Sequence, residues 1–272
     1  MEHRIFKICG FSALLLIIVF ASIYNCLVII NSGFEYRIVV KTCPMIILTF
    51  LIFGYMFIYR VSIYSSIILF SLFFCTLGDI LIGIYDPSVA YISRNQTIYF
   101  IVGGSFFLIA RVLFCIMFMF KPYRKVDIIR HSWKKMILSH IIFMIPFIVL
   151  GILNIVKETS FITISVFIYM FFGFGIQLSY AFLRIGALEE ESKWSSLFGF
   201  IGMFLFNISD ILLFISMYTD WVPSYVTPIS DNIYWLAIYL ICISVVRSSN
   251  EYIEKGNSYI PISLTIETEN FN

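Results

Sequence analysis

The sequence predicts an all-α membrane protein in which eight transmembrane helices form one bundle. Apolar residues make up 61% of the 272 residues, charged residues only 12%, and the mean hydropathy is +0.97. A soluble domain carries about 25% charged residues, so this composition is better explained by a polytopic membrane protein. The net charge of +2 is too small to indicate a nucleic-acid partner.

Four apolar stretches in the first half of the chain are each long enough to cross a hydrocarbon core of about 30 Å. The first resembles a signal peptide, but its apolar core is too long and no small-residue cleavage site follows it. Lys41 and Pro44 lie near the start of the second, the third carries Asp79 and the fourth carries Arg111. The four stretches are residues 8–30, 38–59, 65–85 and 98–120.

Four more spans are predicted in the second half. The fifth contains Pro146, which is tolerated because neighbouring helices can satisfy the carbonyl that a proline frees. The seventh carries Asp210. Residues 1–247 would then form the bundle, and the polar residues 248–272 a flexible cytosolic tail. The four spans are residues 136–156, 161–185, 194–218 and 232–246.

The basic residues predict the orientation in the membrane. With eight spans both ends lie on one side, and most Lys and Arg residues fall in the ends and connections on that side. The most basic connection, KPYRKVDIIRHSWKK (121–135), is explained by this topology signal or by contact with anionic lipid heads. Both ends are therefore predicted to be cytosolic, and the endoplasmic reticulum membrane is expected if the source is eukaryotic.

Two aspartates interrupt stretches that otherwise suit lipid: Asp79 in LGDILIGIY (77–85) and Asp210 in FNISDILLFISMY (206–218). A carboxylate inside hydrocarbon costs roughly 3 kcal/mol or more, so it usually has a function or a partner. A helix rises about 1.5 Å per residue, which puts Asp79 about 9 Å and Asp210 about 12 Å below the non-cytosolic ends of their helices. We therefore predict that both carboxylates meet in one cleft.

Further polar side chains are predicted to reach the same layer and to contact a substrate. Lys41 enters from the outer side and could bind a phosphate or simply anchor the helix at the interface. Arg111 lies deeper, about 20 Å from the outer end of its helix, and can extend towards the acids. It could also pair with them only to hold the bundle together. The remaining candidates are Tyr169, Asn207, Tyr234 and Tyr239.

Two carboxylates that lie close together in a low dielectric cannot both ionise. One keeps a proton and can act as an acid, while the other acts as a base or stabilises a cation. This arrangement suits hydrolysis of a bond that a lipid presents within the membrane. The alternatives are that each acid only bonds a neighbouring helix, or that the acids relay protons in a transporter.

No other constellation indicates catalysis. The six cysteines lie in apolar segments without CxxC spacing, and the three histidines lack metal-ligand spacing. The chain has no dinucleotide-binding, P-loop or nucleophile-elbow motif. We therefore expect no metal site.

Together these stretches resemble the YhhN-like lysoplasmalogenase family, the transmembrane protein 86 group. SLFFCTLGDILI (71–82) and LFNISDILLF (205–214) are similar to the family's G-D and S-D motifs in the third and seventh of eight spans. The resemblance runs in order from residue 41 to residue 247. It also includes KTCP (41–44), FIVGGSFFLIAR (100–111), AFLRI (181–185) and NIYWLAIYLICIS with Arg247 (232–247).

The resemblance implies hydrolysis of the vinyl-ether bond of lysoplasmalogen, a 1-alkenyl-glycerophosphocholine or -ethanolamine, to a fatty aldehyde and glycerophosphocholine or glycerophosphoethanolamine. It implies that Asp79 and Asp210 are the catalytic pair, that Lys41 contacts the headgroup, and that no metal or cofactor takes part. The expected partners are an ether lysolipid and the membrane.

The chain departs from the family pattern in two spans. Where the family has H-x-x-Y in the fourth span, this chain has Arg111 and Phe114, and the last span has Ile238 and Tyr239 where a Gln is expected. Arginine cannot shuttle a proton at neutral pH. A second hypothesis is therefore a catalytically impaired lipid-binding or transport protein of the same fold.

Overall fold

The computed structural model describes residues 2–30, 34–59, 61–84, 94–119, 134–145, 169–185, 193–218 and 226–254. These residues are almost entirely helical and contain no strand, which confirms the all-α prediction. Residues 134–145 are helical as well. The labelled elements are α1 (Glu2–Ile29), α2 (Phe34–Tyr59), α3 (Ile63–Ile84), α4 (Arg94–Phe118), the π-helix η1 (Phe171–Gln177), α7 (Leu178–Arg184), α8 (Lys193–Tyr218) and α9 (Val226–Glu254).

Six of the described helices are long and apolar enough to cross a membrane, which fits an integral multi-pass membrane protein. The predicted fifth and sixth spans are described only over 134–145 and 169–185, so the total of eight spans stays a prediction. The cytosolic position of both ends and the organelle also stay predictions. The six stretches are Cys9–Ile29, Tyr36–Ile58, Ile63–Ile84, Ile98–Phe118, Lys193–Phe214 and Val226–Asn250.

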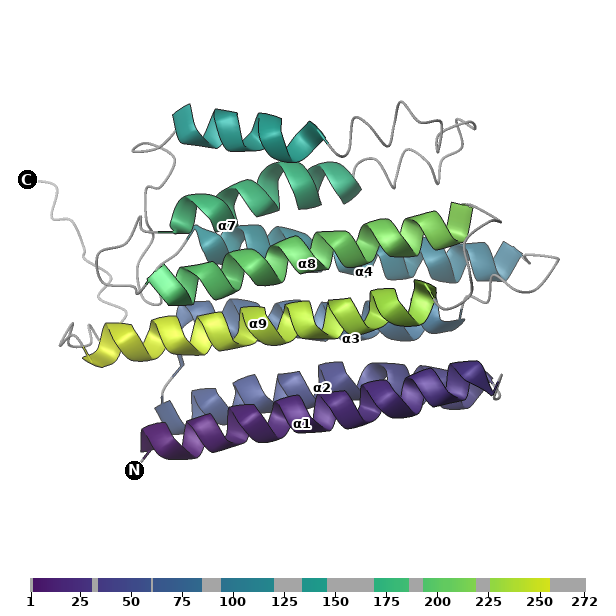
Figure 1. Ribbon diagram of the computed structural model, residues 1–272, viewed down its shortest axis with the longest axis horizontal. Helices are drawn as coiled ribbons and strands as arrows, with labels where there is room; N and C mark the ends of the chain where they lie inside the picture. Colours follow the sequence, from purple (N-terminus) through teal and green to yellow (C-terminus); the bar gives the residue numbers. More distant parts are fainter. Residues whose placement is uncertain are drawn as a thin grey trace, which may run out of the picture.

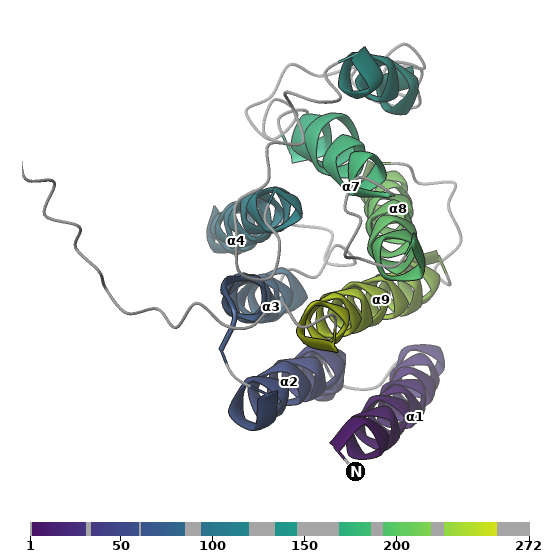
Figure 2. The same cartoon turned by 90° about the vertical axis from the view of Figure 1, so that its left-hand side faces the viewer.

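The helices lie side by side with their long axes roughly aligned, and α1 begins at the same end of the bundle at which α9 finishes (Figure 1). Seen along these axes, α9 lies in the interior and packs on α8, α1, α2 and α3 (Figure 2). In the most apolar stretch of α9, 61% of the residues are buried. The corresponding share in α1, which lies at the edge of the bundle, is 17%. The polar groups of α9 can therefore face the centre of the bundle.

The seam between α8 and α9 is made of small residues, which let the two backbones approach closely. The Ser195 and Ser244 hydroxyls each donate to the other residue's carbonyl, at 2.9 and 2.7 Å. A Cβ atom added at Gly202 would lie 2.7 Å from the Ile241 side chain and 2.8 Å from the Ala237 carbonyl oxygen. This close contact holds together the two helices that carry Asp210, Asp231 and Tyr234 of the site described below.

The last span begins earlier than the sequence analysis predicted. α9 starts at Val226 instead of residue 232, and it continues to Glu254. Pro228 lies in its first turn, where backbone N–H groups have no carbonyl partner within the helix. The N–H group that proline lacks therefore costs no helical hydrogen bond there. The extra turns bring Ser230 and Asp231 into the helix, which matters for the site.

Replacing Gly202 by leucine should destabilise the bundle by about 3 kcal/mol, because the new side chain meets backbone that cannot move aside. Thermal unfolding in detergent micelles would measure the effect. Gly54→Leu is the matched control, since a Cβ at Gly54 has no protein atom within 4 Å. Equal unfolding midpoints for the two variants would contradict the close α8–α9 seam.

Candidate functional site

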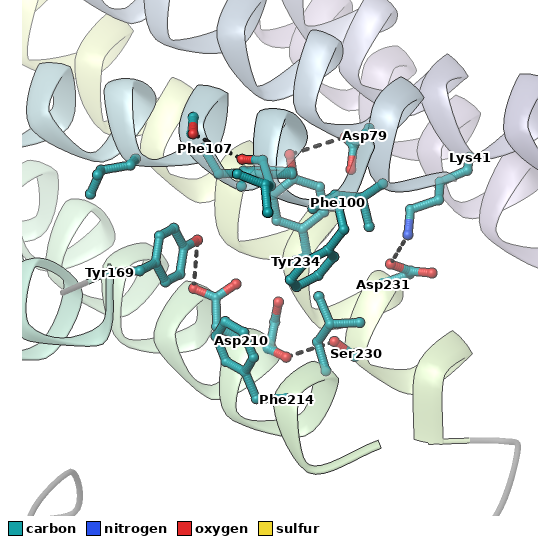
Figure 3. Close-up of a pocket in the computed structure, with 17 residues that line it drawn as sticks. Lys41, Asp79, Phe100, Phe107, Tyr169, Asp210, Phe214, Ser230, Asp231 and Tyr234 are labelled. Atoms are coloured by element: carbon teal, nitrogen blue, oxygen red, sulfur yellow. Dashed lines mark hydrogen bonds and ion pairs between the residues drawn. The ribbon is translucent and has the colours of Figure 1, made fainter. Parts of the chain in front are cut away.

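A cavity of about 210 Å³ lies among α2, α3, α4, α8, α9 and Tyr169, which stands two residues before η1 (Figure 3). Asp79 and Asp210 both line it, as the prediction of a common cleft requires. Phe100 and Phe107 of α4 lie on one side, and Phe214 of α8 on the other. The cavity therefore combines a few polar groups with mostly apolar walls, which is the usual composition of a small-molecule site.

Asp210 is held by two neighbours. Its Oδ2 atom forms an ion pair with the Arg111 guanidinium and accepts a hydrogen bond of 3.1 Å from the Tyr169 hydroxyl. The Arg111 side chain is fully buried, and the Asp210 side chain is 10% exposed. Because each charge has a partner of opposite sign, both can be kept at membrane depth.

Arg111 is itself held by polar and aromatic groups. Its Nη1 donates to the Gln177 side-chain oxygen at 2.6 Å and to that of Asn207 at 3.0 Å. Its Cζ lies 4.3 Å from the ring centre of Tyr169 and 4.5 Å from that of Phe206, a distance at which cation–π attraction is effective. The guanidinium is therefore fixed in position, and it points its charge at Asp210.

The π-helix η1 provides space for this arrangement. A Cβ atom added at Gly173 would run into Arg111 and into Asn207, so the backbone passes directly beside the guanidinium. The Asn207 amide in turn donates to the Gly173 carbonyl at 3.4 Å. Single π-helical turns are rare and frequently mark functional sites. Here the wider turn places Gln177 against Arg111.

Asp79 lies in a different environment. It is 3% exposed and accepts a hydrogen bond of 3.1 Å from the Tyr234 hydroxyl. Within the described part of the chain, no Lys, Arg or His lies within ion-pairing distance of its carboxyl. The two aspartates that the sequence analysis treated alike therefore differ, because only Asp210 is paired with a cation.

A third acid, Asp231, completes the cavity and was missed by the sequence analysis. It forms an ion pair of 2.8 Å with Lys41, and its other oxygen accepts a 2.8 Å hydrogen bond from the Tyr24 hydroxyl. The predicted start of the last span at residue 232 left Asp231 in the connection before that span. The available signal was Lys41, because an ammonium at membrane depth requires a counter-ion.

The structure divides the candidate residues into three groups. Five line the cavity, two lie behind Asp210, and one lies elsewhere. Tyr239 is the exception, because its hydroxyl donates to the Gly10 carbonyl at 3.3 Å on the side of α9 that faces α1. The lining residues are Lys41, Asp79, Tyr169, Asp210 and Tyr234, the two behind are Arg111 and Asn207, and the sequence analysis missed Gln177, Ser230 and Asp231.

The charges of the site nearly cancel. Two cations meet three acids, and the pairs Arg111–Asp210 and Lys41–Asp231 leave Asp79 as the remaining acid. No group of three His, Cys, Asp or Glu side chains that could hold a metal ion occurs among the described residues. The groups available for chemistry in the cavity are therefore carboxyl groups, hydroxyls and one ammonium.

The Arg111–Asp210 pair predicts strongly coupled effects on stability. Arg111→Met or Asp210→Leu alone should cost about 3–5 kcal/mol, because each leaves a buried charge without its partner. The double variant should lose less than the sum of the two single losses. Unfolding measurements on the four proteins in micelles would show this, and additive losses would contradict the ion pair.

Comparison with known proteins identifies a family for this chain. No curated protein and no solved structure matches the chain. The YhhN family, by contrast, matches residues 36–245, a segment that includes every residue lining the cavity. Because this segment covers most of the 272 residues, the chain belongs to the YhhN family.

Proposed function

We propose that the protein is an intramembrane hydrolase that cleaves the vinyl-ether bond of lysoplasmalogen to a fatty aldehyde and glycerophosphocholine or glycerophosphoethanolamine. Membership of the YhhN family supports this assignment. The observation that carries it is the difference between the two aspartates of one cavity. Among the described residues Asp79 has no cation within ion-pairing distance, whereas Asp210 is paired with Arg111.

In the first step Asp79 acts as the acid. A buried carboxyl without a cation is least costly in its neutral form, so Asp79 can hold the proton that the reaction needs. It donates this proton to the alkene carbon remote from the ether oxygen, and the double-bond electrons form the new C–H bond. An oxocarbenium ion results, and the Asp79 carboxylate left behind stabilises it.

In the second step Asp210 acts as the base. It takes a proton from a water molecule whose oxygen adds to the oxocarbenium carbon, which gives a hemiacetal. The hemiacetal hydroxyl then returns a proton to Asp79 while the bond from that carbon to the glycerol oxygen breaks. Asp210 protonates the departing oxygen, so both aspartates regain their starting states and one water has been consumed.

Arg111 is a positioning residue in this mechanism. Its guanidinium stays protonated, so it cannot take part in proton transfer. Its ion pair instead favours the carboxylate form of Asp210 and holds Oδ2, together with the Tyr169 hydroxyl. The departure from the family's His is therefore compatible with an acid–base mechanism that uses the two aspartates alone.

The second ion pair is suited to the lipid headgroup. An ammonium has three N–H donors, and within the described residues Lys41 uses one of them on Asp231. A phosphate can accept from the others, while Asp231 offers a negative charge to the ethanolamine or choline nitrogen. Both residues line the same cavity as the catalytic candidates, so a bound headgroup would place the adjoining ether bond near them.

Asp79→Asn and Asp210→Asn should each lower hydrolysis by about 10²- to 10⁴-fold, because each removes one proton-transferring group. Release of fatty aldehyde from lysoplasmenylethanolamine by the purified protein would measure the loss. Tyr239→Phe is the control, since its hydroxyl bonds Gly10 away from the cavity. Wild-type rates for both Asn variants would refute the assignment.

Lys41→Gln should raise KM for lysoplasmenylethanolamine by about tenfold and change kcat much less, because a headgroup contact is made equally in the ground state and the transition state. Steady-state kinetics over a range of substrate concentrations would separate the two constants. A fall in kcat with an unchanged KM would instead place Lys41 in the chemical step.

The Arg111–Asp210 ion pair also supports a second candidate, a protein that binds or transports lysolipid without cleaving it. In this case the pair would hold Asp210 inactive. The test compares binding of a 1-O-alkyl lysolipid, which has no vinyl bond, with aldehyde release by the wild type and Arg111→His. Binding without release by the wild type favours this candidate, and release by the wild type counts against it. Release by Arg111→His alone would show that Arg111 holds the site inactive.

A further inference from the structure

We propose that the cavity opens sideways into the bilayer along α4, and that a single-chain lipid enters there with its polar head leading and its chain left in the hydrocarbon. This inference rests on the proposed function for the identity of the reacting bond. It adds the direction from which the substrate comes and the part of it that the protein encloses.

The exposure of the lining residues shows where the cavity opens. The charged residues that line it are all buried, and as whole residues they are at most 8% exposed. On α4, by contrast, Gly104 and Leu108 are partly exposed, and Ser105 is exposed. Ile82 of α3 and Leu213 and Phe214 of α8 are also partly exposed, so Ser105 is the most exposed residue of the lining and the open edge is centred on its face of α4. We call this face, formed by Ile101, Gly104, Ser105 and Leu108, the α4 edge.

The depth of the α4 edge decides what it opens into. Ser105 lies seven residues inside the apolar stretch Ile98–Phe118, which corresponds to about 10 Å along the helix. At that depth the surroundings are lipid chains and not water. A soluble substrate would meet a hydrocarbon barrier here, whereas a lipid already lies beside the opening.

The volume of the cavity limits what it can hold. About 210 Å³ is less than the roughly 300–1,000 Å³ of pockets that enclose drug-sized ligands. A lysolipid with a long chain is larger than a drug-sized ligand, so only its head and the first atoms of its chain can enter this cavity. The rest must pass through an opening that faces hydrocarbon, and the α4 edge meets this requirement.

Two neighbouring glycines on α4 have different surroundings. A Cβ atom at Gly103 would meet Ile82 at 2.8 Å, because this side of α4 packs tightly on α3. A Cβ atom at Gly104 would have no protein atom within 4 Å, although Gly104 lines the cavity. The space beside Gly104 is therefore free for a ligand, and a larger side chain can fill it without disturbing the helices.

The first experiment maps the chain of a bound lipid directly. A 1-O-alkyl lysophosphatidylethanolamine with a diazirine in its chain would be cross-linked to the wild-type protein in bilayers and located by mass spectrometry. We expect labelled residues on the α4 edge and at Leu213–Phe214 of α8, which also line the cavity. Labels confined to other parts of the chain would overturn the inference.

The second experiment fills the opening. Gly104→Leu should lower both the cross-linking yield and aldehyde release by about tenfold or more, while Gly54→Leu should leave both unchanged. Gly54 is a matched control because its Cβ also meets open space, but on α2 and outside the cavity. Equal thermal midpoints of the two variants would show that folding is intact, and wild-type cross-linking in Gly104→Leu would overturn the inference.

The outcomes separate this inference from the proposed function. Cross-links on the α4 edge in a protein that releases no aldehyde would support the sideways opening and refute the hydrolase. Aldehyde release with cross-links only elsewhere would support the hydrolase and refute the opening. The cross-linking experiment on the wild type depends on neither activity nor a variant, so it decides the question alone.

Discussion

The ion pair between Arg111 and Asp210 is the interaction on which the site depends. A guanidinium at membrane depth needs a carboxylate and further acceptors, and here it has Asp210 and Asn207 from α8 and Gln177 from η1. The π-helical turn and the glycine at position 173 follow from the same need, because the backbone must come close to the guanidinium. One buried charge therefore fixes how α4, η1 and α8 meet.

The second ion pair, between Lys41 and Asp231, fixes how the helices on the other side of the bundle meet. Lys41 on α2 and Asp231 on α9 hold each other, and Tyr24 on α1 bonds the same carboxylate. With these two pairs formed, Asp79 is the acid of the cavity that has no described cation within ion-pairing distance, and the Tyr234 hydroxyl from α9 holds it in place. Asp79 and Asp210 are the same residue type, so their proposed roles as acid and base differ because different helices pack against them.

The residues that sequence reasoning missed share a cause. Asp231 was placed outside the last span because helix ends are the least certain feature of an apolar pattern. Gln177 was missed because a π-helical turn shifts side-chain directions away from the regular helical period. Tyr239 was predicted to reach the layer of the acids, yet its hydroxyl bonds Gly10 near the start of α1, fourteen residues before Tyr24, which bonds Asp231 of the cavity.

The amino-acid sequence alone determined that this protein is helical, suits a membrane, and carries Asp79, Asp210, Lys41 and Arg111 within its apolar stretches. It also determined the height of each group, because a helix rises by a constant amount per residue. The tertiary structure decided which way each helix is rotated about its axis and therefore which charges pair. This rotation depends on side-chain packing between helices that are far apart in the sequence. A helix that is apolar on nearly all sides has little periodic pattern in its sequence to show which side faces the interior.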